Sequence, residues 1–165
     1  MLKGKNILIG ISGGIAAYKT PYLVRLFKLA GADVKVILTD SASQFVSPLT
    51  LATLSENPVP SSFIKEDEQG DISWNNHVAL ALWADLMVVA PATANTLSKM
   101  AHGQSDNLLL VTYLSAKCPV FIAPAMDLDM YKNKSTKDSL DKLATFGNAI
   151  INYNLIHRRV RIIRI

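Results

Sequence analysis

The sequence predicts a three-layer α/β fold, in which helices cover both faces of a doubly wound parallel sheet. Short apolar runs alternate along the chain with segments of helical periodicity, which is the pattern of α/β proteins. The first apolar run ends in Ser12-Gly13-Gly14, and a helical pattern begins directly after it. A strand, a glycine turn and a helix in this order are typical of the first unit of such a sheet.

Buried strands are predicted where β-branched and other apolar residues run together. In chain order the predicted strands are Ile7–Ile11, Val34–Leu38, Leu86–Ala90, Val120–Ala123 and Ala149–Ile151.

Helices are predicted where apolar residues recur three and four positions apart between recognisable end signals. The first runs from about Ala16 to Ala30, and Gly31 ends it. Ser47 before Pro48 predicts an N-cap, and Ser135 with Asp138 predicts another. The other helices are expected at Ser47–Ser55, Ala94–Ala101, Asn107–Ser115 and Thr136–Phe146. Residues 56–75 show no clear periodicity and are expected to form a loop or an excursion over the sheet.

A length of 165 residues indicates one domain, which we place at residues 1–152, followed by a basic tail at 153–165. The net charge of +4 equals the contribution of Arg158, Arg159, Arg161 and Arg164 in that tail. The remainder of the chain therefore has no excess of basic residues, and a nucleic-acid partner is not expected.

Targeting signals are not expected either. No apolar run reaches about 18 residues, the length that spans a bilayer. The first strand begins close to Met1 and leaves no room for a signal peptide. The single cysteine, Cys118, excludes an internal disulfide and suits a reducing cytoplasm, which is the expected location.

Ligands of open parallel sheets bind beyond the carboxyl ends of the strands. Small and hydroxyl-bearing residues follow the predicted strands at this edge. The glycine turn provides backbone N–H groups at a helix N-terminus, which favours a phosphate-bearing ligand. An ordinary connecting turn, and helix capping by Thr39 and Thr96, are the alternatives. The candidate binding residues are Ser12, Gly13, Gly14, Ile15, Thr39, Ser41, Phe45, Thr93, Ala94, Asn95, Thr96, Ala125, Met126 and Asp127.

His77 is the candidate general base, because histidine titrates near neutral pH. It precedes an apolar helical segment, so a capping or surface role is the alternative. His102 and His157 have no motif around them, and no metal site is expected. Cys118, just before an apolar strand, is expected to be a packed thiol.

Four motifs in this order resemble the flavin-containing cysteine decarboxylases, which have a Rossmann-like flavoprotein fold. They are the glycine-turn segment at 13–19, His77 followed by Trp83-Ala84-Asp85, the segment at 90–96, and Pro124-Ala125-Met126. The likeness runs from about residue 4 to 152 and is greatest to members that decarboxylate phosphopantothenoylcysteine in coenzyme A synthesis.

The resemblance implies FMN as the cofactor and a homotrimer, or a dodecamer of trimers, with flavin at subunit contacts. It implies that the substrate thiol is oxidised by hydride transfer to FMN, after which carbon dioxide leaves and an enethiol forms. His77 matches the family's active-site histidine. Pro124 to Asp127 match the motif whose last residue binds the substrate carboxylate. The flavin residues map onto the glycine turn, Thr39, Phe45 and Thr93–Thr96.

Two departures from the family pattern bear on activity. Asp127 stands where the family commonly has asparagine, and an ionised aspartate repels a carboxylate. No cysteine follows Cys118, whereas coenzyme A pathway members use a later cysteine to reduce the enethiol. An impaired reductive half-reaction is therefore expected. A peptidyl-cysteine decarboxylase, a flavin prenyltransferase and a non-enzymatic binding subunit of the same fold are the alternatives.

Overall fold

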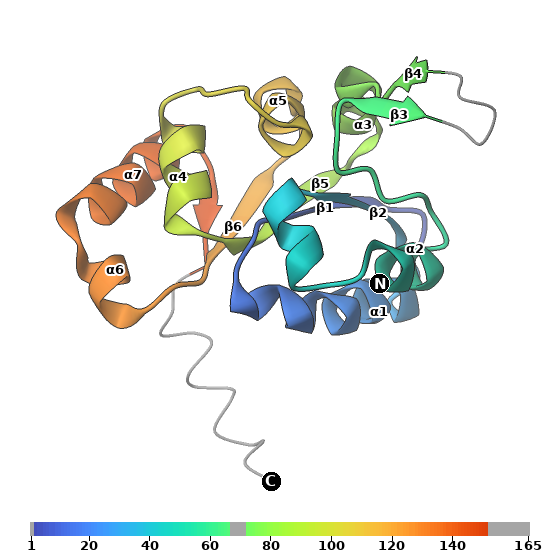
Figure 1. The fold of residues 1–165 in the computed structure, drawn as a ribbon, viewed down its shortest axis with the longest axis horizontal. Helices are drawn as coiled ribbons and strands as arrows, with labels where there is room; N and C mark the ends of the chain where they lie inside the picture. The colour runs from blue at the N-terminus through green and yellow to red at the C-terminus, as the bar shows by residue number, and fades with distance from the viewer. Residues whose placement is uncertain (1, 67–71, 152–165) are drawn as a thin grey trace, which may run out of the picture.

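The computed structural model describes residues 2–66 and 72–151, and five parallel strands form its main sheet (Figure 1). The sheet has the order β2-β1-β5-β6-β7. Its strands are β1 Asn6–Ile11, β2 Asp33–Leu38, β5 Leu86–Ala92, β6 Val120–Pro124 and β7 Ala149–Ile150. All neighbouring pairs run parallel, so the predicted doubly wound α/β class is confirmed. The boundary expected at residue 152 and the tail at 153–165 lie outside the described residues.

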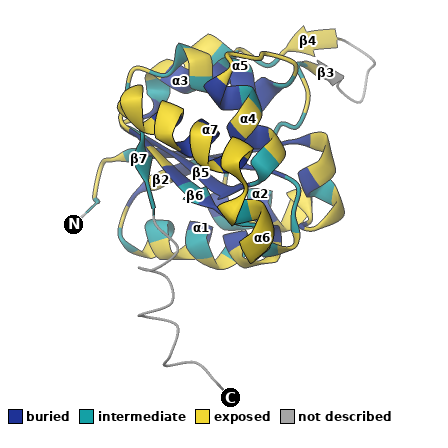
Figure 2. Ribbon diagram, turned by 90° about the vertical axis from the view of Figure 1, so that its left-hand side faces the viewer, coloured by how far each residue is buried: buried dark blue, intermediate teal, exposed yellow. Residues whose placement is uncertain are grey.

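The alternation of side chains along each strand produces two separate apolar cores. Ile7 and Ile9 of β1 pack on one face of the sheet, with α1 Thr20–Leu29 and α2 Pro48–Ser55. Leu8 packs on the other face, which is covered by four helices (Figure 2). These are α3 His77–Trp83, α4 Ala94–Ala101, α5 Leu108–Ser115 and α7 Lys134–Thr145. The layers leave the carboxyl ends of the strands free to form a site.

The helix predicted over residues 16–30 is divided in the structure. A 3₁₀ helix, η1 Ile15–Lys19, comes first, and α1 begins at Thr20. The Thr20 hydroxyl donates to the Ala17 carbonyl at 2.7 Å, and Pro21 occupies the first turn of α1, where no backbone N–H is needed. Gly31 has a φ of 89°, which confirms the predicted end signal.

The loop predicted at residues 56–75 is wrong in part, because an antiparallel hairpin lies within it. Strands β3 Ile64–Glu66 and β4 Ile72–Trp74 pair there and project from the body of the molecule (Figure 1). The rings of Phe63 and Trp74 stack at 5.5 Å beside the hairpin. Strands this short give no period-two pattern in the sequence. The short helices η2 Asp40–Gln44 and α6 Leu128–Lys132 were not predicted.

The two predicted N-caps have different outcomes. Ser47 caps α2 and accepts the Thr50 N–H at 3.4 Å, as predicted. The N-cap of α7 is Asn133, so the prediction of Ser135 is wrong. The Asn133 side chain accepts the Ser135 N–H at 3.0 Å. Asparagine and serine are both favourable N-cap residues, so the residue types alone did not decide between these two positions. In the described part of the chain, every helix is too short or too polar to cross a membrane.

Candidate functional site

The loops that follow β1, β2, β5 and β6 enclose one side of a cavity of about 980 Å³. These loops leave the carboxyl ends of the strands, so the cavity lies where the fold class predicts a ligand. Its volume is at the upper end of the range of about 300–1,000 Å³ that is usual for small-molecule sites.

The glycine turn after β1 forms one wall of this cavity because side chains from the next loop come very close to it. A Cβ atom on Gly13 would lie 2.3 Å from Ser41 Oγ and 2.8 Å from the Ser41 carbonyl carbon. On Gly14 it would lie 3.2 Å from Thr93 Cγ2. Gly14 has extended backbone, so space rather than dihedral freedom limits both positions: a side chain does not fit at position 13, and at position 14 it requires Thr93 to shift by a few tenths of an ångström. The backbone of the turn is thereby exposed to a ligand.

Hydroxyl groups gather on the walls beside the glycine turn. Thr39 Oγ1 and Ser41 Oγ lie 3.2 Å apart. Thr93 is the N-cap of α4 and accepts the Thr96 N–H at 3.4 Å, and its hydroxyl donates to Thr96 Oγ1 at 3.2 Å. The alternative of helix capping is wrong for Thr96, which lies inside α4. Thr39 occupies the N-cap position of η2, although its side chain makes no capping hydrogen bond.

The opposite wall comes from the segment after β6. The Ala125 N–H donates to the Ala92 carbonyl at 3.0 Å, which fixes this segment against the end of β5. Met126 and Met130 provide apolar surface, and Asp127 is exposed at the start of α6 without capping it. Apolar surface facing hydroxyl and backbone donors suits a ligand with a flat ring and an anionic group.

The two lysines on the cavity wall differ in whether they form an ion pair. Lys99 of α4 forms an ion pair with Asp106, which precedes α5. Lys19, at the end of η1, makes no ion pair within residues 2–66 and 72–151. Asp40 and Asp127 add carboxylates on the same wall. Lys19 is thus the cation most available to an anionic ligand.

The Flavoprotein family model matches residues 1–160. The chain belongs to this family.

Two relatives are similar to this chain in sequence. The chain is 46% identical over 151 residues to the coenzyme A biosynthesis bifunctional protein CoaBC of Bacillus subtilis (strain 168). The alignment covers 92% of this chain and 36% of that protein. It is 57% identical over 106 residues to a cysteine/cysteine sulfinic acid decarboxylase from an unknown prokaryotic organism, which covers 64% of this chain and 29% of that protein. The chain thus spans little more than a third of the length of CoaBC.

A solved structure in the same group supports the fold. It is a mutant PPC decarboxylase complexed with pantothenoylaminoethenethiol. The TM-score is 0.74 at 34% identity, and the alignment covers 89% of this chain and 81% of that chain. The Rossmann-like flavoprotein fold expected from the sequence is confirmed.

Most of the predicted site residues of this flavoprotein lie around the same cavity. Their individual roles remain predictions. Those on the cavity wall are Gly13, Gly14, Ile15, Thr39, Ser41, Thr93, Ala94, Asn95, Thr96, Ala125, Met126 and Asp127.

Three predicted residues do not line the cavity: Ser12, Phe45 and His77. Ser12 is buried behind the wall, because its side chain points back to the end of β5. Phe45 follows η2 and is 40% exposed. The roles predicted for Ser12, Phe45 and His77 remain predictions.

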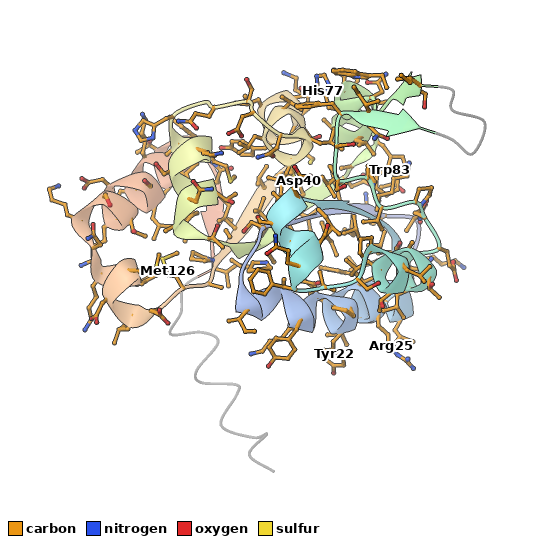
Figure 3. All side chains as sticks on the ribbon, viewed as in Figure 1. Tyr22, Arg25, Asp40, His77, Trp83 and Met126 are labelled. Atoms are coloured by element: carbon orange, nitrogen blue, oxygen red, sulfur yellow. The ribbon has the colours of Figure 1, made fainter. Side chains whose placement is uncertain are left out.

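His77 lies at the hairpin end of the molecule, away from Met126 (Figure 3). It begins α3, whose N-cap is Asn76, so the alternative that His77 is the cap is wrong. Its ring meets Trp74 edge-on at 6.4 Å, and its buried Nδ1 has no hydrogen-bond partner within the described ranges. A catalytic His77 would therefore have to act outside the cavity of its own chain.

Cys118 lies before β6, at the amino end of the strand and so opposite the cavity. Burial raises the pKa of its thiol, which keeps it protonated and unreactive. The structure agrees with the expected packed thiol.

Sequence reasoning did not single out Lys19, Lys99 and Asp106 on the cavity wall. Lys19 lies within the motif that carried the resemblance. Lys99 lies three residues after Thr96, on the same side of α4, and this helical spacing could have identified it. Asp106 has no such signal, because its place depends on how α5 packs.

Proposed function

We propose that this chain is an FMN-dependent decarboxylase that acts on 4′-phosphopantothenoylcysteine in coenzyme A synthesis, in the cytoplasm. The observation that carries the proposal is the convergence of four strand-end segments on one cavity. Membership of the Flavoprotein family and the likeness to CoaBC support the same cofactor and substrate.

The residues of the cavity fit FMN in three respects. Gly13 and Gly14 leave the backbone open to a phosphate, and the hydroxyls of Thr93 and Thr96 offer donors at the start of α4. Met126 and Ala125 offer an apolar face for the ring. Ile15, Thr39, Ser41, Ala94 and Asn95 complete the proposed cofactor wall.

Bound FMN would supply the hydride acceptor for oxidation of the substrate thiol to a thioaldehyde, whose C=S group would take up the electron pair that carbon dioxide leaves behind. The chain has to bind the cysteine carboxylate and remove the thiol proton. Asp127, with Ala125 and Met126, lies where the carboxylate is proposed to bind, and Lys19 is a cation on the wall of the same cavity. His77 is the proposed base.

His77 lies outside the cavity of its own chain, so its role as the base requires a second copy of the chain. A homotrimer, alone or assembled into a dodecamer, would provide that copy. The imidazole of one copy would then act at the cavity of a neighbouring copy. The hairpin beside His77 offers an apolar contact surface, because Ile72 is 74% exposed and Trp74 is 59% exposed.

The purified 165-residue polypeptide is expected to release carbon dioxide but to stop at the enethiol. No cysteine lies between residues 119 and 165, so this polypeptide contains no late thiol to donate the proton of the reductive step. Anaerobic reaction followed by mass spectrometry checks this. Formation of saturated phosphopantetheine, with the flavin returned to its oxidised spectrum, would contradict it.

The test of the proposed function begins with the absorption spectrum of the purified protein and its titration with FMN. Carbon dioxide release from phosphopantothenoylcysteine follows, with the dephosphorylated substrate as the comparison. A protein that binds no FMN would overturn the cofactor assignment. A flavin-loaded protein that leaves phosphopantothenoylcysteine unchanged would overturn the substrate assignment.

A cysteine decarboxylase that takes a smaller substrate is the second candidate. The 57% identity to a cysteine/cysteine sulfinic acid decarboxylase favours it, although only over 64% of the chain. Free cysteine and a peptide ending in cysteine, assayed beside phosphopantothenoylcysteine, distinguish the candidates by their kcat/KM values.

A further inference from the structure

Ser12 is almost completely buried, with 1% of its surface exposed, yet it bonds to two segments of the cavity wall. Its hydroxyl donates to the Pro91 carbonyl at 2.6 Å and accepts the Thr93 N–H at 3.0 Å. Its own N–H donates to the same carbonyl at 3.2 Å. Ser12 therefore joins the end of β1 to the loop that leads from β5 into α4.

A hydroxyl group has one proton to donate and two lone pairs that accept, and this limits the bonds that Ser12 can make. The short bond to Pro91 uses the Ser12 proton, so Ser12 Oγ accepts the Thr93 N–H, and Thr93 Oγ1 lies 3.4 Å from the same oxygen. The Thr93 hydroxyl in turn donates to Thr96 Oγ1 at 3.2 Å. Thr96, which lines the cavity, donates its own proton to no other group among the described residues. The hydroxyls of Ser12, Thr93 and Thr96 thus form one connected network, and Thr93 and Thr96 line the cavity.

We propose that Ser12 is a positioning residue that fixes the Thr93 loop and thereby holds the Thr93 and Thr96 hydroxyls where the anionic group of the cofactor binds. The inference rests on the proposed FMN function. It replaces direct binding by Ser12 with an indirect role, because the Ser12 side chain does not reach the cavity.

Ser55 provides a matched control within the same chain. It is equally buried, donates to the Asn57 carbonyl at 3.2 Å and accepts the Asn57 N–H at 3.3 Å. It ends α2 and lies away from the cavity. Ser12→Ala and Ser55→Ala therefore remove the same group with the same kinds of partner.

The experiment titrates the flavin-free parent and both variants with FMN and with riboflavin, which lacks the phosphate, and follows the change in flavin fluorescence. Ser12→Ala is expected to lose about tenfold in FMN affinity, because a displaced Thr93 loop weakens the strong hydrogen bonds of Thr93 and Thr96 to the charged phosphate, and to keep its riboflavin affinity. Ser55→Ala is expected to keep both. The ratio of the two affinities is a readout that a general loss of packing would not change.

A second variant tests the same role if Ser12→Ala does not fold. Ser12→Cys keeps a side chain of similar size but replaces the hydroxyl by a thiol, which is only a weak donor and acceptor, and should cause the same selective loss of FMN affinity. Thr93→Val changes the proposed cofactor wall itself, so its combination with Ser12→Ala tests the network: the double variant should lose no more than Thr93→Val alone.

Unchanged FMN affinity in Ser12→Ala, or equal losses for FMN and riboflavin, would overturn the positioning role and leave the proposed function standing. A parent protein that binds neither flavin would overturn the proposed function, and this inference with it.

Discussion

At the scale of single residues, the cavity concentrates charges whose balance decides what it can bind. Asp127 is exposed on the wall that is proposed to hold the substrate carboxylate, and its side chain makes no capping bond to α6. An ionised aspartate only accepts hydrogen bonds, whereas asparagine also donates. The residue at this position therefore determines whether a carboxylate meets a donor or a like charge.

Asp127→Asn is expected to lower the KM for phosphopantothenoylcysteine about tenfold near neutral pH. The change removes a like charge and supplies an N–H donor for the carboxylate. Steady-state kinetics of carbon dioxide release measure the effect. Asp129→Asn, an exposed neighbour outside the cavity wall, is the control. A higher KM in Asp127→Asn would show that the carboxylate of Asp127 has a role of its own.

His77→Asn is expected to retain FMN but to lower kcat by about a hundredfold to ten-thousandfold, the usual contribution of a general base. The substitution leaves the cavity wall unchanged, so the flavin spectrum should match that of the parent. His102→Asn is the control, because His102 lies on α4's end outside this cavity and bonds the Ser98 carbonyl. Turnover at the parental rate would assign His77 a structural role.

At the scale of elements, the site depends on connections that hold strand ends in register. Asp85, just before β5, accepts the Asn6 N–H at 2.8 Å, and the Asp85 N–H donates to the Asn6 carbonyl at 2.9 Å. Lys5 Nζ lies 3.4 Å from the same carboxylate. These bonds align β1 with β5 at their amino ends, and the loops at the other ends form the cavity.

Asp85→Ala is expected to lower the Tm at pH 7 by an amount that shrinks as the pH falls. The Asn6 N–H lowers the pKa of Asp85, with a smaller effect of Lys5. Because the pKa is lower in the folded state, the stabilisation is present above about pH 4, the unfolded value, and is lost as the pH falls through the folded value.

Thermal unfolding of parent and variant between acidic and neutral pH measures this difference. Asp141→Ala, at an exposed aspartate of α7, is the control. A difference in Tm that stays constant across this range would indicate that packing, not the carboxylate charge, accounts for the loss.

At the scale of the whole molecule, the proposed reaction needs groups that one copy of the chain keeps apart. The cavity lies at the carboxyl ends of the strands, whereas His77 lies beside the hairpin (Figure 3). The proposed trimer would bring the hairpin of one copy to the cavity of the next. A copy with an altered cavity and a copy without His77 should then form an active site together.

Mixed oligomers of His77→Asn and Gly13→Ala chains are expected to be more active than either homo-oligomer. A Cβ on Gly13 would collide with Ser41 and impair the FMN wall, while the His77 of that copy stays intact. Co-expression with two different tags isolates the mixed species, and carbon dioxide release is measured. Activity no greater than the sum of the separate variants would place both groups in one copy.

The order of β-branched runs and helical patterns determined the sheet, the layers and the edge where the site lies, because local periodicity encodes which faces are buried. The same patterns placed most of the cavity wall, since parallel strands end at a common edge. Packing between distant segments decided the rest. It turned Ser12 away from the cavity, separated His77 from it, paired Lys99 with Asp106, and held a hairpin through the Phe63–Trp74 stack. None of these contacts has a local period, so only the folded arrangement of distant segments could reveal them.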